Sequence, residues 1–386
     1  MPHIAGLRGV VPEASKAAEL ANAPLDVAKG LAAGTLARDV TRCVYRYHVA
    51  FAGPGRQLVR KSIVAAVRLS PWAEGMIRRH EEVTDAARAA ALARIKANGG
   101  AHTQAVMAGV RDTAAEVDRF FRRAESGPPT LKVTTKDGVH HTMWRVSDAE
   151  VIGKLRNYFT PKKLHVLDGH DTYEGMLAYQ AELAAKAEPS MYSSANYGLF
   201  NIVTMEDQGL VSAALHKVVK GAGKRDELLE KTRKHFIVEK LAGVANQTDK
   251  LLAALGDSVA HQAVFVAVFA GDADAYKLTL SPDVSPVHEG VAVDRALAKL
   301  DPNVVEHMFV RRHLASATIT SEPDAKQALA ALGSGAELVL LVRPTSIEQR
   351  VHVDELNQTL PPSSTTLYPA PAQLVAMIID PDEEMV

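Results

Sequence analysis

Residues 164 to 175 read LHVLDGHDTYEG, and this stretch decides how the middle of the chain folds. An apolar run typical of a buried strand stops at Asp168, and an amphipathic helical pattern begins after Gly169. A glycine at such a turn lets a ligand approach the main chain, and His170 would stand at the helix N-terminus. These residues suit a phosphorylated ligand. An ordinary turn, in which Asp168 caps the helix, explains them equally well.

The composition is that of a globular protein with two or three compact units. Of 386 residues, 47% are hydrophobic, and 44 basic side chains nearly balance 45 acidic ones. The net charge of -1 argues against nucleic acid as a partner. Cys43 is the only cysteine, which excludes an intramolecular disulfide. Without a signal-peptide pattern or an apolar run of about 20 residues, we expect a cytoplasmic protein with no membrane contact.

Hydrophobic patterning predicts an α+β fold. Strands are expected at residues 42 to 51 and 61 to 69, and a helix from residue 85 to 97 that ends at Asn98-Gly99-Gly100. Residues 131 to 146 indicate a hairpin that turns at Asp137-Gly138 in type I′ geometry. A short helix is expected near residues 148 to 158.

The last third of the chain is expected to form an α/β extension. Residues 224 to 255 read as continuously helical. Two strands follow within residues 262 to 281, and further strands are expected near 337 to 343 and 373 to 379. The acidic end at residues 380 to 384 is expected to fray.

Glu81 is the second candidate for catalysis, because it lies in a charged turn before a helix. It could act as a general base if Asp168 lies across a cleft, or it could simply favour the helix dipole. Arg88, one or two helical turns later, could hold a phosphate or cover the outer face. No HExxH spacing occurs, which disfavours a zinc site of that kind. A P-loop at residues 220 to 224 is disfavoured, since Val218 and Arg225 replace its glycine and hydroxyl residue, and a flexible basic loop that caps the next helix fits better.

Taken in order, short blocks spread over nearly the whole chain resemble the bacterial and archaeal family catalogued as the domain of unknown function DUF1015. Asp168-Gly169-His170 with Tyr173-Glu174 resembles the family's Asp-Gly-His-His-Arg-Tyr-Glu, and His80-Glu81 resembles its His-Glu-x-Thr turn. The remaining blocks are Ala23-Pro24-Leu25-Asp26-Val27, Tyr45-Arg46-Tyr47, His216-Lys217, Arg343-Pro344-Thr345-Ser346 and Leu360-Pro361-Pro362-Ser363-Ser364-Thr365.

The resemblance implies a ParB-like central unit, related to nucleotide-binding partition proteins and to an archaeal ADP-dependent kinase of free serine. We therefore expect an N-terminal wrapping segment at residues 1 to 59, the ParB-like unit at 60 to 220 and the C-terminal extension at 221 to 386. The implied activity is transfer of a phosphoryl group from ADP, ATP or CTP, with Mg²⁺, to a small serine-like hydroxyl compound. Glu81 and Asp168 would be catalytic, and Asp168 would bind the metal. The nucleotide would contact Gly169, His170, Arg88, His216, Lys217, Ser364 and Thr365.

The chain departs from the family pattern at cationic positions. Asp171-Thr172 stands where the family has His-Arg, and Ser363 and Ala370 replace lysines. Each charge-assisted hydrogen bond contributes roughly 1.5 to 3 kcal/mol, so these losses weaken a phosphate site. An alternative is therefore a catalytically degenerate relative, which binds a small molecule or nucleotide or serves assembly on the same scaffold. The oligomeric state is left open.

Overall fold

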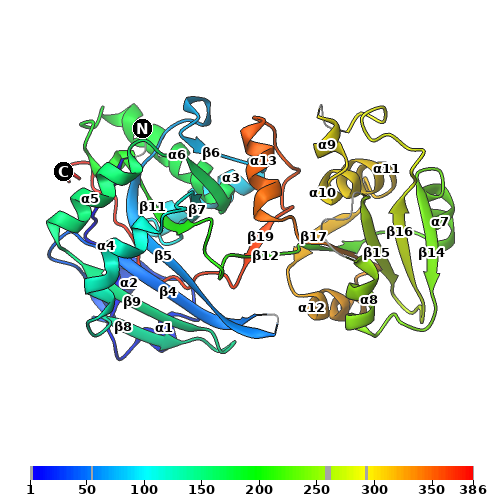
Figure 1. Cartoon of the computed structure of the whole chain (residues 1–386), viewed down its shortest axis with the longest axis horizontal. Coiled ribbons are helices and arrows are strands. Elements are labelled where there is room, and N and C mark those ends of the chain that lie inside the picture. The colour runs from blue at the N-terminus through cyan, green and yellow to red at the C-terminus, as the bar shows by residue number, and fades with distance from the viewer. Residues whose placement is uncertain (1–2, 54, 257–261, 292–293, 386) are drawn as a thin grey trace. The chain divides into compact units, whose positions relative to one another are not determined.

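A computed structural model describes residues 3–53, 55–256, 262–291 and 294–385 (Figure 1). The chain divides into two compact units, of which the first comprises Met1–Val211 and Leu367–Val386 and the second Ser212–Thr366. The chain passes from the first unit to the second within β12 (Val211–Ala213) and returns within β19 (Thr366–Tyr368). These limits differ from the expected ones at residues 59 and 220. The last 20 residues belong with the first unit because they pack into its core.

Within the described residues, the first unit is built on a nine-stranded mixed sheet in which eight strands follow the order β6-β10-β7-β11-β5-β4-β9-β8, and β1 pairs with β5. Their bounds are β6 (Ile77–Arg78), β10 (Leu164–Asp168), β7 (Val106–Val110), β11 (Tyr197–Thr204), β5 (Arg56–Arg68), β4 (Val44–Gly53), β9 (His140–Val146), β8 (Leu131–Thr134) and β1 (Ile4–Ala5). A small sheet joins β2 (Val10–Pro12) to β3 (Leu36–Arg38). The expected strands at 42 to 51 and 61 to 69 are confirmed as β4 and β5, which lie inside the sheet.

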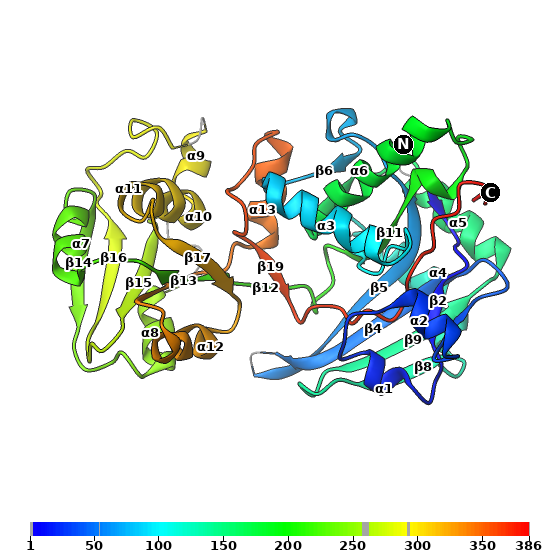
Figure 2. The same ribbon diagram turned by 180° about the vertical axis from the view of Figure 1, so that it is seen from behind.

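Helices flank this sheet, and α3 and α6 lie side by side in both Figure 1 and Figure 2. Gly175 of α6 permits this contact, since a Cβ there would stand 2.7 Å from the Cβ of Ala91. The expected helices at 85 to 97 and 148 to 158 are confirmed as α3 and α5. The helices of the unit are α1 (Ala17–Leu20), α2 (Val27–Ala32), α3 (Asp85–Ala97), α4 (Glu116–Glu125), α5 (Ala149–Phe159) and α6 (His170–Lys186), with short 3-10 turns at Trp72–Glu74 and Ser194–Asn196.

The hairpin of β8 and β9 is confirmed, but its turn is not type I′. The amide of Gly138 donates to Thr135 O, the amide of Thr135 donates to Val139 O, and only Gly138 has a positive φ, of 82°. A type I′ turn needs positive φ at both central residues. The loop is therefore a type I turn followed by a left-handed glycine.

The second unit contains, in the part that the structure describes, a six-stranded antiparallel sheet in the order β14-β16-β15-β18-β13-β17. The strands are β14 (Phe236–Leu241), β16 (Ala275–Leu280), β15 (Val264–Phe269), β18 (Leu338–Val342), β13 (His216–Lys220) and β17 (Thr318–Glu322). Its helices are α7 (Arg225–Thr232), α8 (Thr248–Leu255), α9 (Arg295–Ala298), α10 (Asp301–Val304), α11 (Arg311–His313), α12 (Ala325–Ala330) and α13 (Ile347–Glu355), with a π-helical turn at Val305–Val310 and a 3-10 turn at Ala331–Ser334.

The continuous helix expected over residues 224 to 255 is wrong. β14 interrupts it, because Phe236 and its neighbours pair with β16 and Phe236 packs into the core of the second unit. Pairing across the sheet outweighed the helical spacing of these apolar residues. The strands expected at 262 to 281 and near 337 are confirmed as β15, β16 and β18.

The end of the chain also differs from expectation. Residues 373 to 379 form isolated bridges, Val10 with Ala376 and His102 with Met377, instead of a strand. The acidic tail does not fray, since buried Glu383 accepts from Arg8 at 2.7 Å and from Arg38 at 2.6 Å. Ion pairing with distant arginines, which local sequence does not reveal, fixes this segment.

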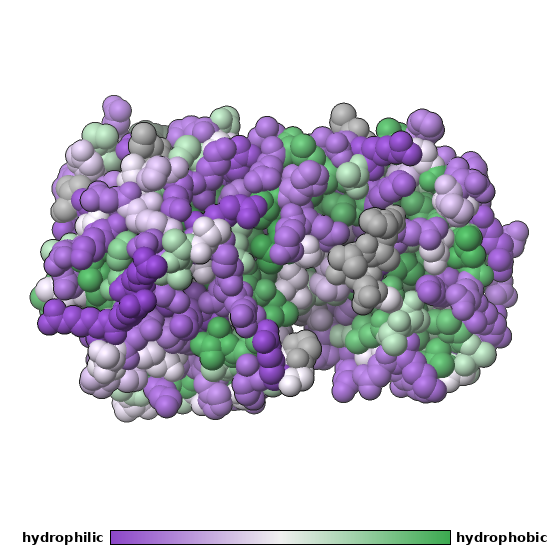
Figure 3. Space-filling model, in the orientation of Figure 1, coloured by the Kyte–Doolittle hydropathy of each residue, from purple (hydrophilic) through white to green (hydrophobic). Residues whose placement is uncertain are grey.

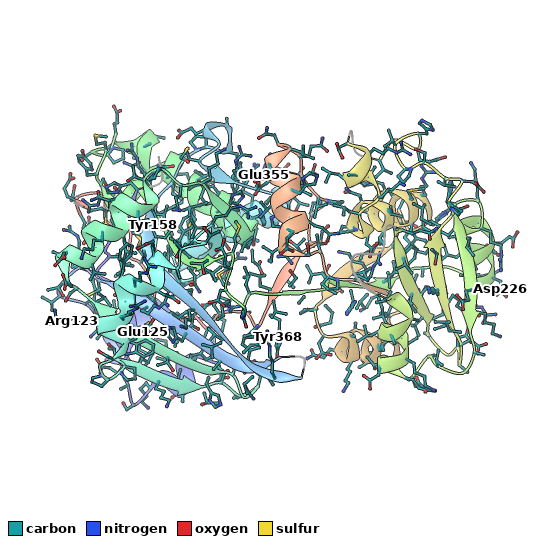
Figure 4. The ribbon with its side chains drawn as sticks, in the orientation of Figure 1. Arg123, Glu125, Tyr158, Asp226, Glu355 and Tyr368 are labelled. Atoms are coloured by element: carbon teal, nitrogen blue, oxygen red, sulfur yellow. The ribbon has the colours of Figure 1, made fainter. Side chains whose placement is uncertain are left out.

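The surface of the first unit is charged over α4. Hydrophilic residues gather around this helix in Figure 3, and its Glu125, labelled in Figure 4, accepts from buried Arg46 at 2.6 Å. Among the described residues, no helix is both long and apolar enough to cross a bilayer. The mixture of helices with several sheets makes the fold α+β, as the sequence predicts.

Candidate functional site

The site is organised by the turn between β10 and α6. Gly169 adopts a left-handed φ of 82° and directly precedes the first residue of α6. Asp168 Oδ1 accepts from the Gly169 amide at 2.7 Å, and its Oδ2 accepts from the Leu367 amide at 3.3 Å. The N-cap residue of α6 is Gly169, which carries no side chain, so Asp168 is not the N-cap residue of the helix. The first-turn amides of this 17-residue helix therefore favour a negative group.

The strand register places Asp168 at one end of a row of side chains. Asp168 pairs with Met107 of β7, Met107 with Asn201 of β11, and Asn201 with Val64 of β5. Residues that pair directly across strands share a face of the sheet. A register shift between Val166 and Asp168 marks the end of this row, as β-bulges often do beside functional sites.

A cavity of about 290 Å³ lies over this row, entirely within the first unit. Its walls come from the α6 turn, from the segment before β7, from the sheet and from the C-terminal segment that follows β19. The lining residues are Tyr47, Val64, Thr103, Gln104, Ala105, Met107, Met143, Asp168, Gly169, Asp171, Thr172, Asn201, Leu367, Ala370, Pro371, Ala372, Gln373, Leu374 and Val375. Its size suits a small molecule.

Two polar side chains of the sheet, Tyr47 and Asn201, line the cavity, and they differ in their hydrogen bonds. The Tyr47 hydroxyl accepts from the Ala372 amide at 3.2 Å and lies 2.7 Å from His141 Nδ1, to which it can donate. Burial lowers the pKa of His141 to about 4, which keeps this imidazole neutral. Asn201 is 1% exposed, and its Oδ1 has no hydrogen-bond partner within the described structure. Sequence patterning did not single out Asn201, which stands in an apolar strand, whereas Tyr47 belongs to the block Tyr45-Arg46-Tyr47 that resembles the family's aromatic strand.

The charged residues that line the cavity are acidic. Asp168 and Asp171 both contribute to its wall, whereas its lining, as far as the described chain goes, contains no lysine or arginine. Arg94 of α3 offsets part of this charge, with its Nη2 3.1 Å from Asp171 Oδ2. A phosphate in this cavity therefore needs a cation of its own.

Arg60 is a buried cation that contacts the C-terminal segment after β19, which forms one wall of the cavity. It is fully buried and donates to Pro369 O at 2.6 Å and to Tyr368 O at 3.4 Å. Burial lowers the pKa of Arg60, and the carboxylates of Asp207 and Asp168 oppose that shift. Arg60 thus holds the segment that brings Leu367 and Ala370 to the cavity. An arginine within a strand gave no sequence signal of this role.

The Glu81 turn lies beside the Asp168 turn, as the shared-site prediction requires. His80 Nδ1 lies 2.9 Å from Val166 O, and the His80 and His170 rings meet edge to face with centroids 4.5 Å apart. Glu81 is 8% exposed. Neither Glu81 nor His170 lines the cavity. The structure thus brings the two turns together and leaves their catalytic roles as predictions.

Arg88 was expected to contact phosphate, but carboxylates surround it. Its Nη2 lies 2.8 Å from Asp85 Oδ1, and its Nη1 lies 3.8 Å from Glu174 Oε2. Arg88 does not line the cavity, and half of its side chain is exposed. The i,i+3 pair on α3 accounts for its position.

The other four expected nucleotide contacts belong to the second unit. His216 Nδ1 accepts from the Val342 amide at 3.2 Å, and burial lowers the pKa of this histidine to about 4. Lys217 Nζ donates to Ser363 O at 2.6 Å and to Ser321 Oγ at 3.1 Å. Ser364 Oγ donates to Pro361 O at 2.5 Å, and Thr365 is buried. The structure joins Lys217 to the 361 to 365 loop, and the contact of these residues with nucleotide stays a prediction.

Magnesium is the metal that the expected chemistry implies. No group of three histidine, cysteine or acidic side chains gathers as a metal cage in the described ranges. Mg²⁺ is usually held by one or two carboxylates together with phosphates and water, so a cage is not required. Asp168 and Asp171, which line the same cavity, offer oxygen ligands of that type.

A family model described as a protein of unknown function, DUF1015, matches residues 8–303, and the chain belongs to this family. No curated protein matches the chain. A structure titled as a free serine kinase in complex with AMP is similar at 10% identity and a TM-score of 0.41, over 80% of this chain and 90% of that one. A conserved hypothetical protein from Pyrococcus furiosus has 10% identity and a TM-score of 0.41, over 80% and 93% of the two chains. A C-terminally truncated SbnI from Staphylococcus aureus has 9% identity and a TM-score of 0.40, over 83% and 90%.

Proposed function

We propose that the first unit binds a nucleotide as its magnesium complex and transfers a phosphoryl group to a small, serine-like hydroxyl compound. The observation that carries this proposal is the cavity in which Asp168 stands beside the N-terminus of α6. A helix N-terminus attracts phosphate through its free amides and its dipole. The carboxylate beside it offers the oxygen ligand that a magnesium ion between phosphates needs.

Asp168 would hold the magnesium ion together with Asp171, and the bound ion would neutralise charge on the phosphates. The amides of the first turn of α6 would face the phosphate oxygens. This division of roles follows from the acidic lining, because two carboxylates without a metal would repel the phosphates.

Glu81 would act as the general base for the acceptor. It would accept the hydroxyl proton as the hydroxyl oxygen forms a bond to phosphorus, and the bond from phosphorus to the nucleotide oxygen breaks with its electron pair on the nucleotide. His80, which joins the Glu81 turn to Val166 and His170, would fix the position of this carboxylate.

The test is incubation with serine and other hydroxyl amino acids, each with ADP, ATP or CTP and Mg²⁺, followed by mass spectrometry. A phosphorylated product that forms with the wild type and falls by about 100-fold or more in Glu81→Gln would support the proposal, since general-base catalysis contributes roughly that factor. Glu82→Gln serves as a matched control, because its carboxylate is the immediate neighbour. Failure of every nucleotide and acceptor to give product in folded protein would exclude the transfer.

A second candidate is a binding protein without turnover. The acidic lining favours it, because neither lysine nor arginine of the described chain reaches the cavity wall. Calorimetry separates the two candidates. Binding of an unphosphorylated small molecule without Mg²⁺ and without turnover would favour the second, whereas nucleotide binding that requires Mg²⁺ would favour the first.

A further inference from the structure

Asn201 lines the cavity and has an oxygen without a hydrogen-bond partner in the described structure. Its neighbours in the row, Met107 and Val64, are apolar, and its side chain is 1% exposed. Its Oδ1 has no partner in the described structure, while the same carboxamide carries N–H donors beside that oxygen. A buried polar atom without a partner destabilises a protein. Its position in a ligand-sized cavity indicates that a ligand supplies the missing partner.

The surroundings of Asn201 restrict the chemistry of that ligand. Met107 and Met143 line the cavity, and Leu374 and Val375 add an apolar wall. Methionine sulfur packs favourably on aromatic rings. A carboxamide presents one acceptor beside one donor, which matches the edge of adenine, where an amino group adjoins a ring nitrogen. We propose that Asn201 reads the amino edge of an adenine base held against this apolar wall.

The spacing along the floor fits a single nucleotide. Asn201 and Asp168 are separated by two strand intervals, because β7 lies between β11 and β10. Two intervals amount to roughly 10 Å. A base at Asn201 therefore leaves its phosphates near the N-terminus of α6. That the ligand carries phosphates rests on the proposed function. Binding of the base and binding of the phosphates can nevertheless be measured separately.

The experiment is isothermal titration with three probes: adenosine, which lacks phosphate, magnesium pyrophosphate, which lacks a base, and ADP with Mg²⁺. Asn201→Leu, a substitution of similar size, should weaken the binding of adenosine by about tenfold or more, because a base contact with two hydrogen bonds discriminates by about that factor. It should leave the affinity for magnesium pyrophosphate unchanged. Asp168→Asn should show the reverse pattern. Inosine, which carries an oxygen in place of the amino group, should bind the wild type more weakly than adenosine.

Asn201→Asp gives a second, polar test, since it keeps the size and removes the donor. This variant should also bind adenosine more weakly than the wild type. The melting temperature of Asn201→Leu should equal or exceed that of the wild type, because the buried Oδ1 that is removed makes no hydrogen bond in the described structure. This result distinguishes a ligand contact from a structural role. Equal adenosine affinity in the wild type and in both Asn201 variants, or no adenosine binding by the wild type, would overturn the inference. Adenosine binding that needs Asn201, without pyrophosphate binding or turnover, would leave it standing and reject the phosphotransferase.

Discussion

Two buried asparagines, one in each unit, show different uses of the same side chain. Asn303 in the second unit is 2% exposed, and its Nδ2 donates to Leu297 O at 2.7 Å. Asn201 in the first unit is equally buried, yet its Oδ1 has no partner in the part of the chain described. The first arrangement stabilises its own fold. The second leaves hydrogen-bonding capacity at a cavity, where a ligand can use it.

Other buried polar groups in each unit also differ in whether they have a partner. In the second unit, Arg343 donates to both oxygens of buried Asp301, at 2.6 and 2.7 Å. In the first unit, both ring nitrogens of His102 lack a hydrogen-bond partner within the described structure, and burial lowers the pKa of His102 to about 3. His102 directly precedes Thr103 and Gln104 of the cavity wall. Asn201 and His102 thus place polar atoms without a partner at or beside the cavity, while in the described part of the second unit such atoms occur too, at His235 Nδ1 and His313 Nε2.

The largest expected effect is on the buried ion pair of the second unit. Asp301→Ala should destabilise that unit by about 3 to 5 kcal/mol, because Arg343 is left as a buried charge without its partner. Hydrogen exchange measured by mass spectrometry should show faster exchange in β15 and β18, which carry the neighbours of the pair. The double variant Asp301→Leu with Arg343→Met should recover most of the loss. A single variant as stable as the wild type would show that the pair is not buried in solution.

Acid should destabilise both units through their buried histidines. Burial lowers the folded-state pKa of His141 and of His216 from 6.5 to about 4. Between pH 6.5 and pH 4 the unfolded chain takes up protons that the folded chain refuses, so stability falls as the pH falls, by up to about 3 kcal/mol for each histidine. Urea unfolding at pH 7 and pH 4.5 should reveal this loss. His141→Gln should reduce the pH dependence, and exposed His140→Gln should not; equal behaviour of these variants would reject the assignment to His141.

The asparagine comparison itself predicts opposite responses to one substitution. Asn303→Leu should destabilise the protein by about 1 to 3 kcal/mol, since the carbonyl of Leu297 loses its donor. Asn201→Leu should cost nothing or raise the melting temperature. Differential scanning calorimetry on both variants checks the contrast. Equal destabilisation of both would mean that Asn201 has a structural partner in solution.

The smallest expected effect concerns the charge at the start of α6. Asp171→Asn should strengthen binding of nucleotide without Mg²⁺ by about threefold to tenfold at low salt, because a like charge near the phosphate is removed. Stability should change by less than about 1 kcal/mol, since the pair with Arg94 is exposed. Titration calorimetry at low and high salt measures both the gain and its screening. Unchanged affinity would place the phosphates away from this turn.

Local patterns in the sequence determined the strand that ends at Asp168, the glycine turn after it and the helix that follows. The same is true of β4, β5 and α3, since periodicity and stop signals act over neighbouring residues. The mistaken helix at residues 224 to 255 has the opposite cause. β14 forms because its residues pair with β16, more than 30 positions later, and no local pattern reports that partner.

The cavity was decided by the tertiary structure alone. The sequence indicated Asp168 and Gly169, which stand at an element boundary. It gave no signal for Asn201, a single polar residue within an apolar strand, and it included Tyr47 only in a family-like block that implied no role for this side chain at the site. Their significance comes from the register that aligns Asp168, Met107, Asn201 and Val64 across four strands, and from the C-terminal segment that returns over them. Local composition determined most of the strands and helices, whereas long-range pairing decided β14 and decided which polar groups remain without partners around a shared space.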